Sequence, residues 1–157
     1  MAKSGGGVSS ADVEAVMRAS RALVGISAAS IAEVDDIVTV PQLRVMMMIE
    51  TLGPINLSAV AAGLQVSASN ASRICDRLLK IGMVDRGEDP ADRRNITLTL
   101  TSGGQTLINK VIRHRRTAIR RALQQMTPRQ RERLTAAMND FALAAGEPRT
   151  EHDHALV

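Results

Sequence analysis

The chain has almost no aromatic side chains. Its 157 residues include one phenylalanine, Phe141, and neither tryptophan nor tyrosine. Proteins that bind single-stranded DNA or RNA commonly stack bases on aromatic rings. An aromatic stacking platform is therefore excluded, and with it most single-strand and RNA-binding modules.

Cysteine is scarce as well, because Cys75 is the one cysteine of the chain. A single cysteine excludes an internal disulfide framework and any zinc site built from several cysteines. The longest uninterrupted apolar run, Val45 to Ile49, is far shorter than a bilayer requires. Residues 1–10 show no apolar segment followed by a cleavage site, so no secretory signal is visible. We therefore expect a cytoplasmic protein with no membrane partner.

Acidic residues are outnumbered by basic ones. The chain has 20 Lys and Arg residues, 17 of them Arg, against 16 Asp and Glu, which gives a formal net charge of +4. This excess favours a polyanionic partner such as nucleic acid, and the alternative is a compositional bias toward Arg. With 45% hydrophobic and 23% charged residues, the composition is that of a soluble globular protein of one domain or two small lobes.

Apolar residues recur at helical spacing in six segments. Two of these segments begin with the pattern T-x-x-Q, at Thr39 and Thr127, in which the Thr hydroxyl accepts from a first-turn N–H and the Gln reaches back. Asn56 and Ser67 are candidate N-caps of two further helices. The predicted helices cover residues 12–35, 39–52, 57–64, 68–81, 101–126 and 127–145.

A β-hairpin follows the fourth predicted helix. Residues 95–100 alternate between polar and apolar, which is the period of a half-buried strand, and residues 83–86 supply the partner strand. A helix, a short helix, a tight turn, another helix and then a hairpin form the order of a winged helix-turn-helix, in which the second helix of the pair enters the major groove. The predicted fold class is therefore mainly α with a small β-hairpin wing.

One face of the predicted helix 68–81 is rich in hydrogen-bond donors. Its members at i, i+3, i+7 and i+10 are Asn70, Arg73, Arg77 and Lys80. The residues predicted to pack on the other side are Val66, Ala71, Ile74, Leu78 and Ile81. Arg reads guanine and Asn reads adenine through paired hydrogen bonds, although an ordinary solvated face is the alternative. The candidate major-groove residues are Ser67, Ser69, Asn70, Arg73 and Arg77.

The loop of the hairpin supplies a second candidate contact with DNA. Paired arginines in an exposed loop beside the two helices have the chemistry of a wing that enters the minor groove. The candidate wing residues are Arg86, Asp92, Arg93 and Arg94. In this interpretation Asp92 holds Arg86 or Arg94 in position, and the alternative is a turn with a weak surface ion pair.

Two segments together resemble the MarR family of bacterial transcriptional regulators. They are LSAVAAGLQVSASNASRICDRLLKIGMVDR, residues 57–86, and DPADRRNITLTLTSGG, residues 89–104. The resemblance implies that the helix from Ser67 reads the major groove, that Arg94 reaches the minor groove, and that a small ligand or an oxidant regulates binding. It also implies a homodimer. Its helical dimerisation domain would comprise residues 12–38 and 102–146, and its winged DNA-binding domain residues 39–101, with flexible ends at 1–11 and 147–157.

Two kinds of sulfur-containing residue leave alternatives open. Family members that sense peroxide usually carry a reactive cysteine in the first helix, whereas Cys75 matches a buried aliphatic position, so it is either a packed residue or a redox switch. Met46, Met47 and Met48 either line a ligand pocket or fill the core.

A basic segment and a histidine-containing tail complete the candidates. Residues 110–121 hold six Lys or Arg and no acid, which makes this segment a solvated face, a partner for acids of the first helix, or a row of phosphate contacts. The tail with His152 and His154 is expected to be disordered rather than a metal site. No catalytic constellation emerges, so we expect neither an enzyme nor a cofactor.

The function expected from these features is that of a dimeric, sequence-specific, DNA-binding regulator. We expect a repressor that a small organic effector releases from a pseudo-palindromic operator. The alternatives are a non-specific architectural DNA-binding protein and a winged-helix adaptor for protein interactions.

Overall fold

A computed structural model describes residues 7–88 and 96–146 of the chain. Six helices and a small sheet follow one another, which confirms the predicted fold class. The elements in chain order are α1 (Ser10–Ala32), α2 (Val40–Leu52), β1 (Ile55–Asn56), α3 (Leu57–Leu64), α4 (Ala68–Lys80), β2 (Val84–Glu88), β3 (Ile96–Leu100), α5 (Ser102–Gln124) and α6 (Pro128–Ala144). The wing candidates Asp92, Arg93 and Arg94 lie outside the described residues.

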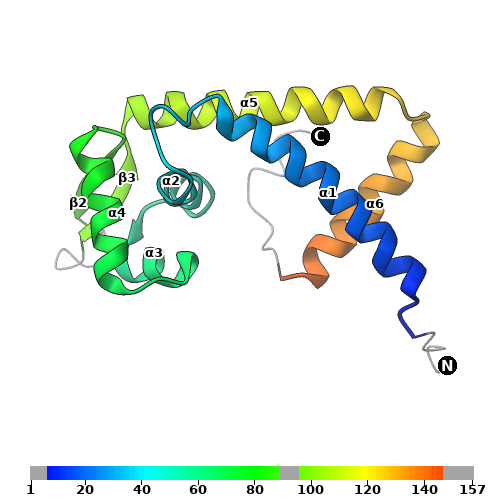
Figure 1. Cartoon of the computed structure of the whole chain (residues 1–157), viewed down its shortest axis with the longest axis horizontal. Helices are drawn as coiled ribbons and strands as arrows, with labels where there is room; N and C mark the ends of the chain where they lie inside the picture. The colour runs from blue at the N-terminus through cyan, green and yellow to red at the C-terminus, as the bar shows by residue number, and fades with distance from the viewer. Residues whose placement is uncertain (1–6, 89–95, 147–157) are drawn as a thin grey trace.

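The molecule is elongated, with a lobe at one end (Figure 1). The lobe contains α2, α3, α4 and the sheet, and α5 leaves it to run along one edge of the molecule. The helix α1 packs against α5, and α6 turns back from the far end of α5 (Figure 1). The long helix α5 therefore connects the lobe to α6 and contacts α1.

Local capping explains where the helices begin. The N–H of Thr39 donates to Oε1 of Gln42 over 2.7 Å, and the N–H of Thr127 donates to Oε1 of Gln130 over 2.8 Å, as the two T-x-x-Q patterns predict. A third capping box, between Ser9 and Asp12, was not predicted and moves the start of α1 to Ser10. The Ser9 hydroxyl and N–H both donate to the Asp12 carboxylate and hold the pKa of that carboxyl below its usual range.

The turn between α3 and α4 is tight because Gln65 adopts a left-handed conformation, with φ of 56°. Helix α4 begins directly after Ser67, whose hydroxyl accepts from the N–H of Asn70 over 3.3 Å and so caps the helix. The predicted cap at Ser67 and the predicted short turn between the two helices are thus confirmed, and the cap fixes where α4 begins within the lobe.

The sheet has three antiparallel strands in the order β1-β3-β2. The predicted hairpin is present, with Val84 opposite Leu100 and Glu88 opposite Ile96. The strand β1 was missed because two residues carry no detectable alternation. The alternating pattern predicts that the apolar residues of β3 are buried and the threonines exposed. This prediction is wrong at the start of the strand, where Ile96 is 59% exposed and Thr97 is buried.

The hydrophobic core fills the interior of the lobe and continues along the first half of α5. It unites side chains from α2, α3, α4, the sheet and α5, including Met46, Cys75 and Leu78. The predicted packing of Ile81 is wrong, since Ile81 is 42% exposed. The helix ends at Lys80, and the backbone of Ile81 has already left the helical conformation that would turn its side chain inward.

The joint between the sheet and α5 depends on one threonine and two glycines. The Thr101 hydroxyl donates to the carbonyl of Gly82 over 2.6 Å and accepts from the N–H of Gly104 over 3.0 Å. A Cβ atom at position 104 would collide with the backbone carbonyl of Met83. The run from Thr101 to Gly104 therefore fixes the start of α5 against the end of α4.

The helix α1 is attached at its C-terminal end and exposed along the rest. Within the part of the chain that the structure describes, α1 is the one helix long and apolar enough to meet length and composition criteria for a membrane span. Its exposed large apolar residues are Val13, Val16, Met17, Leu23 and Val24. Helix α6 buries none of its residues within the described chain, whereas α1 buries only Ser30, so both helices present surface suited to another helix.

Candidate nucleic-acid interface

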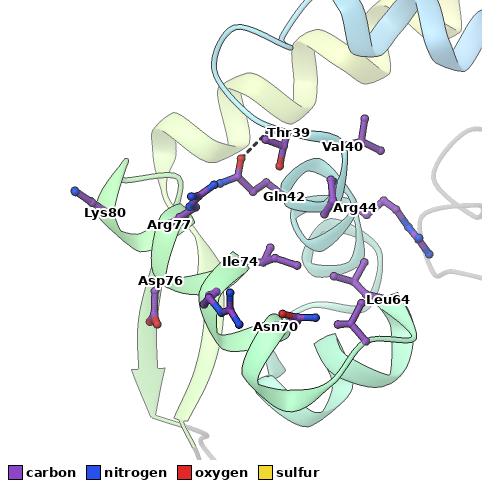
Figure 2. A pocket seen from close by; sticks show the side chains of 13 residues that line it. Thr39, Val40, Gln42, Arg44, Leu64, Asn70, Ile74, Asp76, Arg77 and Lys80 are labelled. Atoms are coloured by element: carbon purple, nitrogen blue, oxygen red, sulfur yellow. Dashed lines mark hydrogen bonds between the residues drawn. The ribbon is translucent and has the colours of Figure 1, made fainter.

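A groove of about 730 Å³ runs between the start of α2 and the outer side of α4. Its apolar floor comes from Val40, Leu64, Val66 and Ile74, and Figure 2 shows Ile74 pointing from α4 toward α2. The polar side chains around it include Arg44, Asn70, Arg73, Asp76, Arg77 and Lys80. The structure therefore brings three of the predicted major-groove residues, Asn70, Arg73 and Arg77, to one rim.

The candidate reading residues are accessible. Ser67, Ser69, Asn70, Arg73 and Arg77 are all exposed. Within the described residues, the guanidinium groups of Arg73 and Arg77 have neither an ion pair nor a hydrogen bond. The opposite side of α4 is held in the core by Ala71, Cys75 and Leu78. A rigid helix thus presents unpaired donors on its outer side, which is the requirement for contact with base edges and phosphates.

The first turn of α4 adds a site for negative charge. The Ser67 hydroxyl is used as the cap, and the Ser69 hydroxyl lies 3.1 Å from it. The first amides of a helix have no intrahelical acceptor, and the helix dipole makes this end positive. The start of α4 is therefore suited to a phosphate, while the residues one and two turns further along are placed for bases.

The wing strand is tied to α4 by an ion pair that was not predicted. Nη2 of Arg86, on β2, donates to Oδ1 of Asp76 over 2.9 Å, and the Ser72 hydroxyl donates to Oδ2 of the same carboxylate over 3.3 Å. Asp92 was the predicted partner of Arg86 or Arg94, and Asp92 lies outside the described residues. The sequence feature that could have indicated this pair is Asp76 itself, because it is the one acidic residue on α4 and is available to a basic residue of the next strand.

Comparison with known proteins agrees with this architecture. Residues 38–96 match the family model described as the MarR family. The chain belongs to the MarR family. It is 41% identical to the solved protein RV1404 from Mycobacterium tuberculosis, with a TM-score of 0.75 over 91% of this chain and 99% of that one.

Two curated relatives of this MarR-family chain come from Bacillus subtilis. The uncharacterized HTH-type transcriptional regulator YfiV is 24% identical over 72% of this chain and 71% of its own length. The HTH-type transcriptional repressor MdtR is 31% identical over 64% of this chain and 63% of its own length. These relatives are named as regulators of transcription, in agreement with the expectation that the chain is not an enzyme.

Cys75 of this MarR-family protein is a core residue. It is 3% exposed and lies on the buried side of α4, opposite the exposed polar residues. Burial raises the pKa of the Cys75 thiol, the charge of Asp76 raises it further, and Arg86 acts in the opposite direction. Because the thiolate is the reactive form, these surroundings favour the packed residue over the redox switch.

A second cavity, of about 470 Å³, lies between α1, α2, α3 and α5. Met47 and Met48 line it together with Arg44 and Arg115, and its remaining lining residues are Ile31, Val40, Leu43, Thr51, Leu52 and Gly63. Met46 is not among them, because it projects from another side of α2 and is fully buried in the core. Two of the three methionines therefore line this cavity, and Met46 fills the core, so each of the two interpretations that the sequence left open describes part of the set.

The basic segment 110–121 divides into two parts. Lys110 donates to the carbonyl of Glu33 over 2.7 Å, and both Lys110 and His114 approach the Glu33 carboxylate, at 3.7 and 3.8 Å. Nε of Arg115 donates to the buried Ser30 hydroxyl over 2.8 Å. These residues attach the end of α1 to α5, which was one of the interpretations the sequence left open. Arg113, Arg116, Arg120 and Arg121 are exposed and take no part in that attachment.

Proposed function

We propose that this MarR-family protein is a homodimer that binds a specific DNA duplex and represses transcription until a small organic molecule releases it. The observation that carries the proposal is the outer side of α4, where Asn70, Arg73 and Arg77 are exposed on a helix whose other side is packed in the core. MdtR, which is named a repressor, supports the direction of regulation.

In this proposal α4 lies in the major groove. Arg73 and Arg77 donate to guanine O6 and N7, and Asn70 pairs with adenine. Ser67, Ser69 and the first amides of α4 contact a phosphate and set the position of the helix along the duplex. Arg94 of the wing enters the neighbouring minor groove, Arg93 contacts a phosphate beside it, and the Arg86–Asp76 pair aligns the wing strand with α4.

A second copy of the chain completes the DNA-binding unit. The apolar surface of α1 and the exposed Met138, Phe141 and Leu143 of α6 would be covered by the same helices of the partner. Residues 12–38 and 102–146 then form the dimerisation domain, and residues 39–101 form each lobe. Two lobes related by a two-fold axis match a pseudo-palindrome whose half-sites lie about one helical turn apart.

The release step is assigned to the cavity lined by Met47 and Met48. It adjoins α1 and α5 on one side and the lobe on the other, so a bound molecule would change how the lobe sits on the long helix. Thioether side chains adapt to differently shaped ligands, and Arg44 and Arg115 supply charge at the wall. The class of ligand that fits is a small, largely apolar organic molecule.

The adaptor alternative finds less support on the described surface. Protein-binding faces rely on aromatic or large apolar anchors, whereas the exposed side of α4 carries hydroxyl, amide and guanidinium groups. A regulator of this kind acts on chromosomal DNA, so we place the protein in the cytoplasm.

Selection of genomic fragments by the purified full-length chain tests the proposal. Sequencing the retained fragments should reveal a shared inverted repeat, and that repeat should outcompete random duplex at matched salt. Equal affinity for the repeat and for random duplex would instead establish an architectural DNA-binding protein. Absence of any duplex binding would favour the adaptor.

A further inference from the structure

A row of three arginines follows one side of α5 after it has left the lobe. Arg113, Arg116 and Arg120 stand at i, i+3 and i+7, and we name them the basic ridge. At about 1.5 Å of rise per residue, the ridge extends over roughly 10 Å of a straight helix. It lies on the side of α5 opposite Leu107, Ile108 and Val111, which are buried in the core.

The ridge is open to a ligand. Its three arginines border a hollow of about 350 Å³ whose other lining residues are Asn109, Ile112 and Thr117, with no carboxylate among the lining. Within the described residues, none of the three guanidinium groups has an ion pair or a hydrogen bond. Glu33, the acid beside α5, is engaged by Lys110 and His114.

The amide of Asn109 adds a neutral donor beside the guanidinium groups. Its Oδ1 accepts from Nε2 of Gln105 over 3.3 Å, which leaves its nitrogen to donate outward. The Thr117 hydroxyl donates to the carbonyl of Arg113 and therefore supports the helix rather than a ligand. Three guanidinium groups and an amide form a set of donors suited to phosphate oxygens.

The basic ridge is separate from the surface that α4 presents. None of its three arginines lines the groove beside α4, and the first of them stands eleven residues after the start of α5, roughly 16 Å along the helix. The ridge also differs from the apolar surface assigned to the dimer. That apolar surface lies on α1 and α6, whereas the ridge lies on α5.

We propose that the basic ridge binds the phosphate backbone of a second DNA duplex, so that one dimer bridges two DNA segments. A row of bidentate donors on a rigid helix matches the repeating charge of a phosphodiester chain. An acidic protein segment is the less suitable partner, because Ile112 is half-buried and the ridge offers no exposed apolar anchor. Binding through α4 would also raise the local concentration of duplex near the ridge.

Four full-length proteins and one control distinguish the contribution of the basic ridge to DNA binding from that of α4. They are the unaltered chain, a lobe variant (Arg73→Ala with Arg77→Ala), a ridge variant (Arg113→Gln, Arg116→Gln and Arg120→Gln), and the combination of the two. The control carries Arg129→Gln, Arg131→Gln and Arg133→Gln, which removes the same charge from exposed positions of α6. Each protein is titrated with a short random-sequence duplex over a series of salt concentrations, and its dimer mass is checked by light scattering.

The lobe variant should keep a residual, salt-dependent affinity for duplex that the combined variant loses by about tenfold or more. Removing three phosphate contacts should lower the slope of log affinity against log salt by about 2.7. In a second assay, the unaltered chain and the α6 control should link a free labelled duplex to a tethered one, and the ridge variant should not. The ridge variant should still bind the tethered duplex.

Other outcomes have defined meanings. If the ridge substitutions leave affinity and bridging unchanged in both backgrounds, the proposal is wrong, and it is also wrong if the α6 control loses as much as the ridge variant. Preference of the ridge for polyglutamate over duplex would assign it to an acidic protein instead. If the lobe substitutions have no effect while the ridge substitutions abolish binding, the proposed role of α4 fails and the role of the ridge stands.

Discussion

Arg86 of β2 and Asp76 of α4 are joined by a 2.9 Å ion pair that connects the hairpin strand to α4. The side chains are 55% and 56% exposed, so solvent screens the pair and it contributes little to folding. Its position gives it a different use. It fixes the angle between two elements that are proposed to enter neighbouring grooves of one duplex.

A double-mutant cycle with Asp76→Ala and Arg86→Ala tests this role. In urea unfolding, the coupling free energy between the two residues should be under about 1 kcal/mol. In duplex binding, loss of either residue should reduce the ratio of operator to random-sequence affinity, and the double variant should lose little more than one single variant. Strictly additive losses of specificity would show that the two residues act independently.

Glycine 104 is expected to tolerate no larger residue. A Cβ atom there meets the fixed carbonyl of Met83, so Gly104→Ala should lower the free energy of unfolding by about 2–4 kcal/mol. Gly103→Ala is the matched control one residue earlier in α5, because its Cβ would have its nearest neighbours at 3.7 and 3.8 Å. The control should be neutral, or more stable by up to about 1 kcal/mol through helix propensity. Thermal melts followed by circular dichroism compare the two, and equal stability would contradict the close approach of α5 to the sheet.

Cys75 is expected to be chemically quiet. Since burial raises its pKa, the neutral thiol should persist through and above neutral pH, and thiol-reactive reagents should modify the folded protein only slowly. Cys75→Val should change stability by less than about 1.5 kcal/mol and leave duplex affinity unaltered. Peroxide should then affect the unaltered chain and Cys75→Val alike. Release of DNA by peroxide that is reversed by a reductant, and that Cys75→Val abolishes, would identify a redox switch.

The homodimer can be tested on α1. Light scattering should give twice the 16.8 kDa chain mass, with detection by peptide-bond absorbance because tryptophan and tyrosine are absent. Replacing Val16 and Leu23 by Glu should produce monomers, since charges would then face the apolar surface of a partner. Arg18→Glu and Arg21→Glu, on the same helix, should leave the mass unchanged. A monomeric unaltered chain at micromolar concentration would refute the assignment of α1 and α6 to the dimer.

The elements that were predicted correctly are those specified by neighbouring residues. Five of the helix starts were predicted to within one residue, from capping at Thr39, Asn56, Ser67 and Thr127 and from the 3.6-residue period. The sixth, α1, starts earlier than expected because its capping box at Ser9 lies outside the apolar period. Local pattern is therefore sufficient where the stabilising contacts span only three or four positions.

The contacts that were missed join residues far apart in the chain. Three of these features depend on how whole elements pack against one another. They are the bond from Arg86 to Asp76, the bond from Arg115 to Ser30, and the two-residue strand β1. The errors at Ile81 and Ile96 have a different origin, because each residue lies at the end of its helix or strand, where the periodic pattern no longer determines burial. The common exposed face of Asn70, Arg73 and Arg77 was predicted because the helix alone sets the direction of these side chains, whereas their contacts with bases remain a prediction that depends on a duplex.

Substitutions in the wing and in α4 should change DNA affinity and specificity in different ways. Arg94 is expected to enter the minor groove, where readout is limited mainly to A·T against G·C pairs and groove width. Arg94→Ala should therefore weaken binding to every site and reduce a preference for A/T-rich flanks. Arg73→Ala should cost about 1–3 kcal/mol only on sites that carry its matching base pair, and so relax specificity there.

Titrations at fixed salt, with operators varied separately in the flanks and in the half-site core, distinguish these effects. Asp92→Ala should resemble a milder Arg94→Ala, because it would release the guanidinium without removing it. Arg93→Ala is the neighbouring control, and as a phosphate contact it should weaken all sites without changing the flank preference. If Arg94→Ala binds every operator as the unaltered chain does, the wing makes no minor-groove contact, and specificity must come from α4 alone.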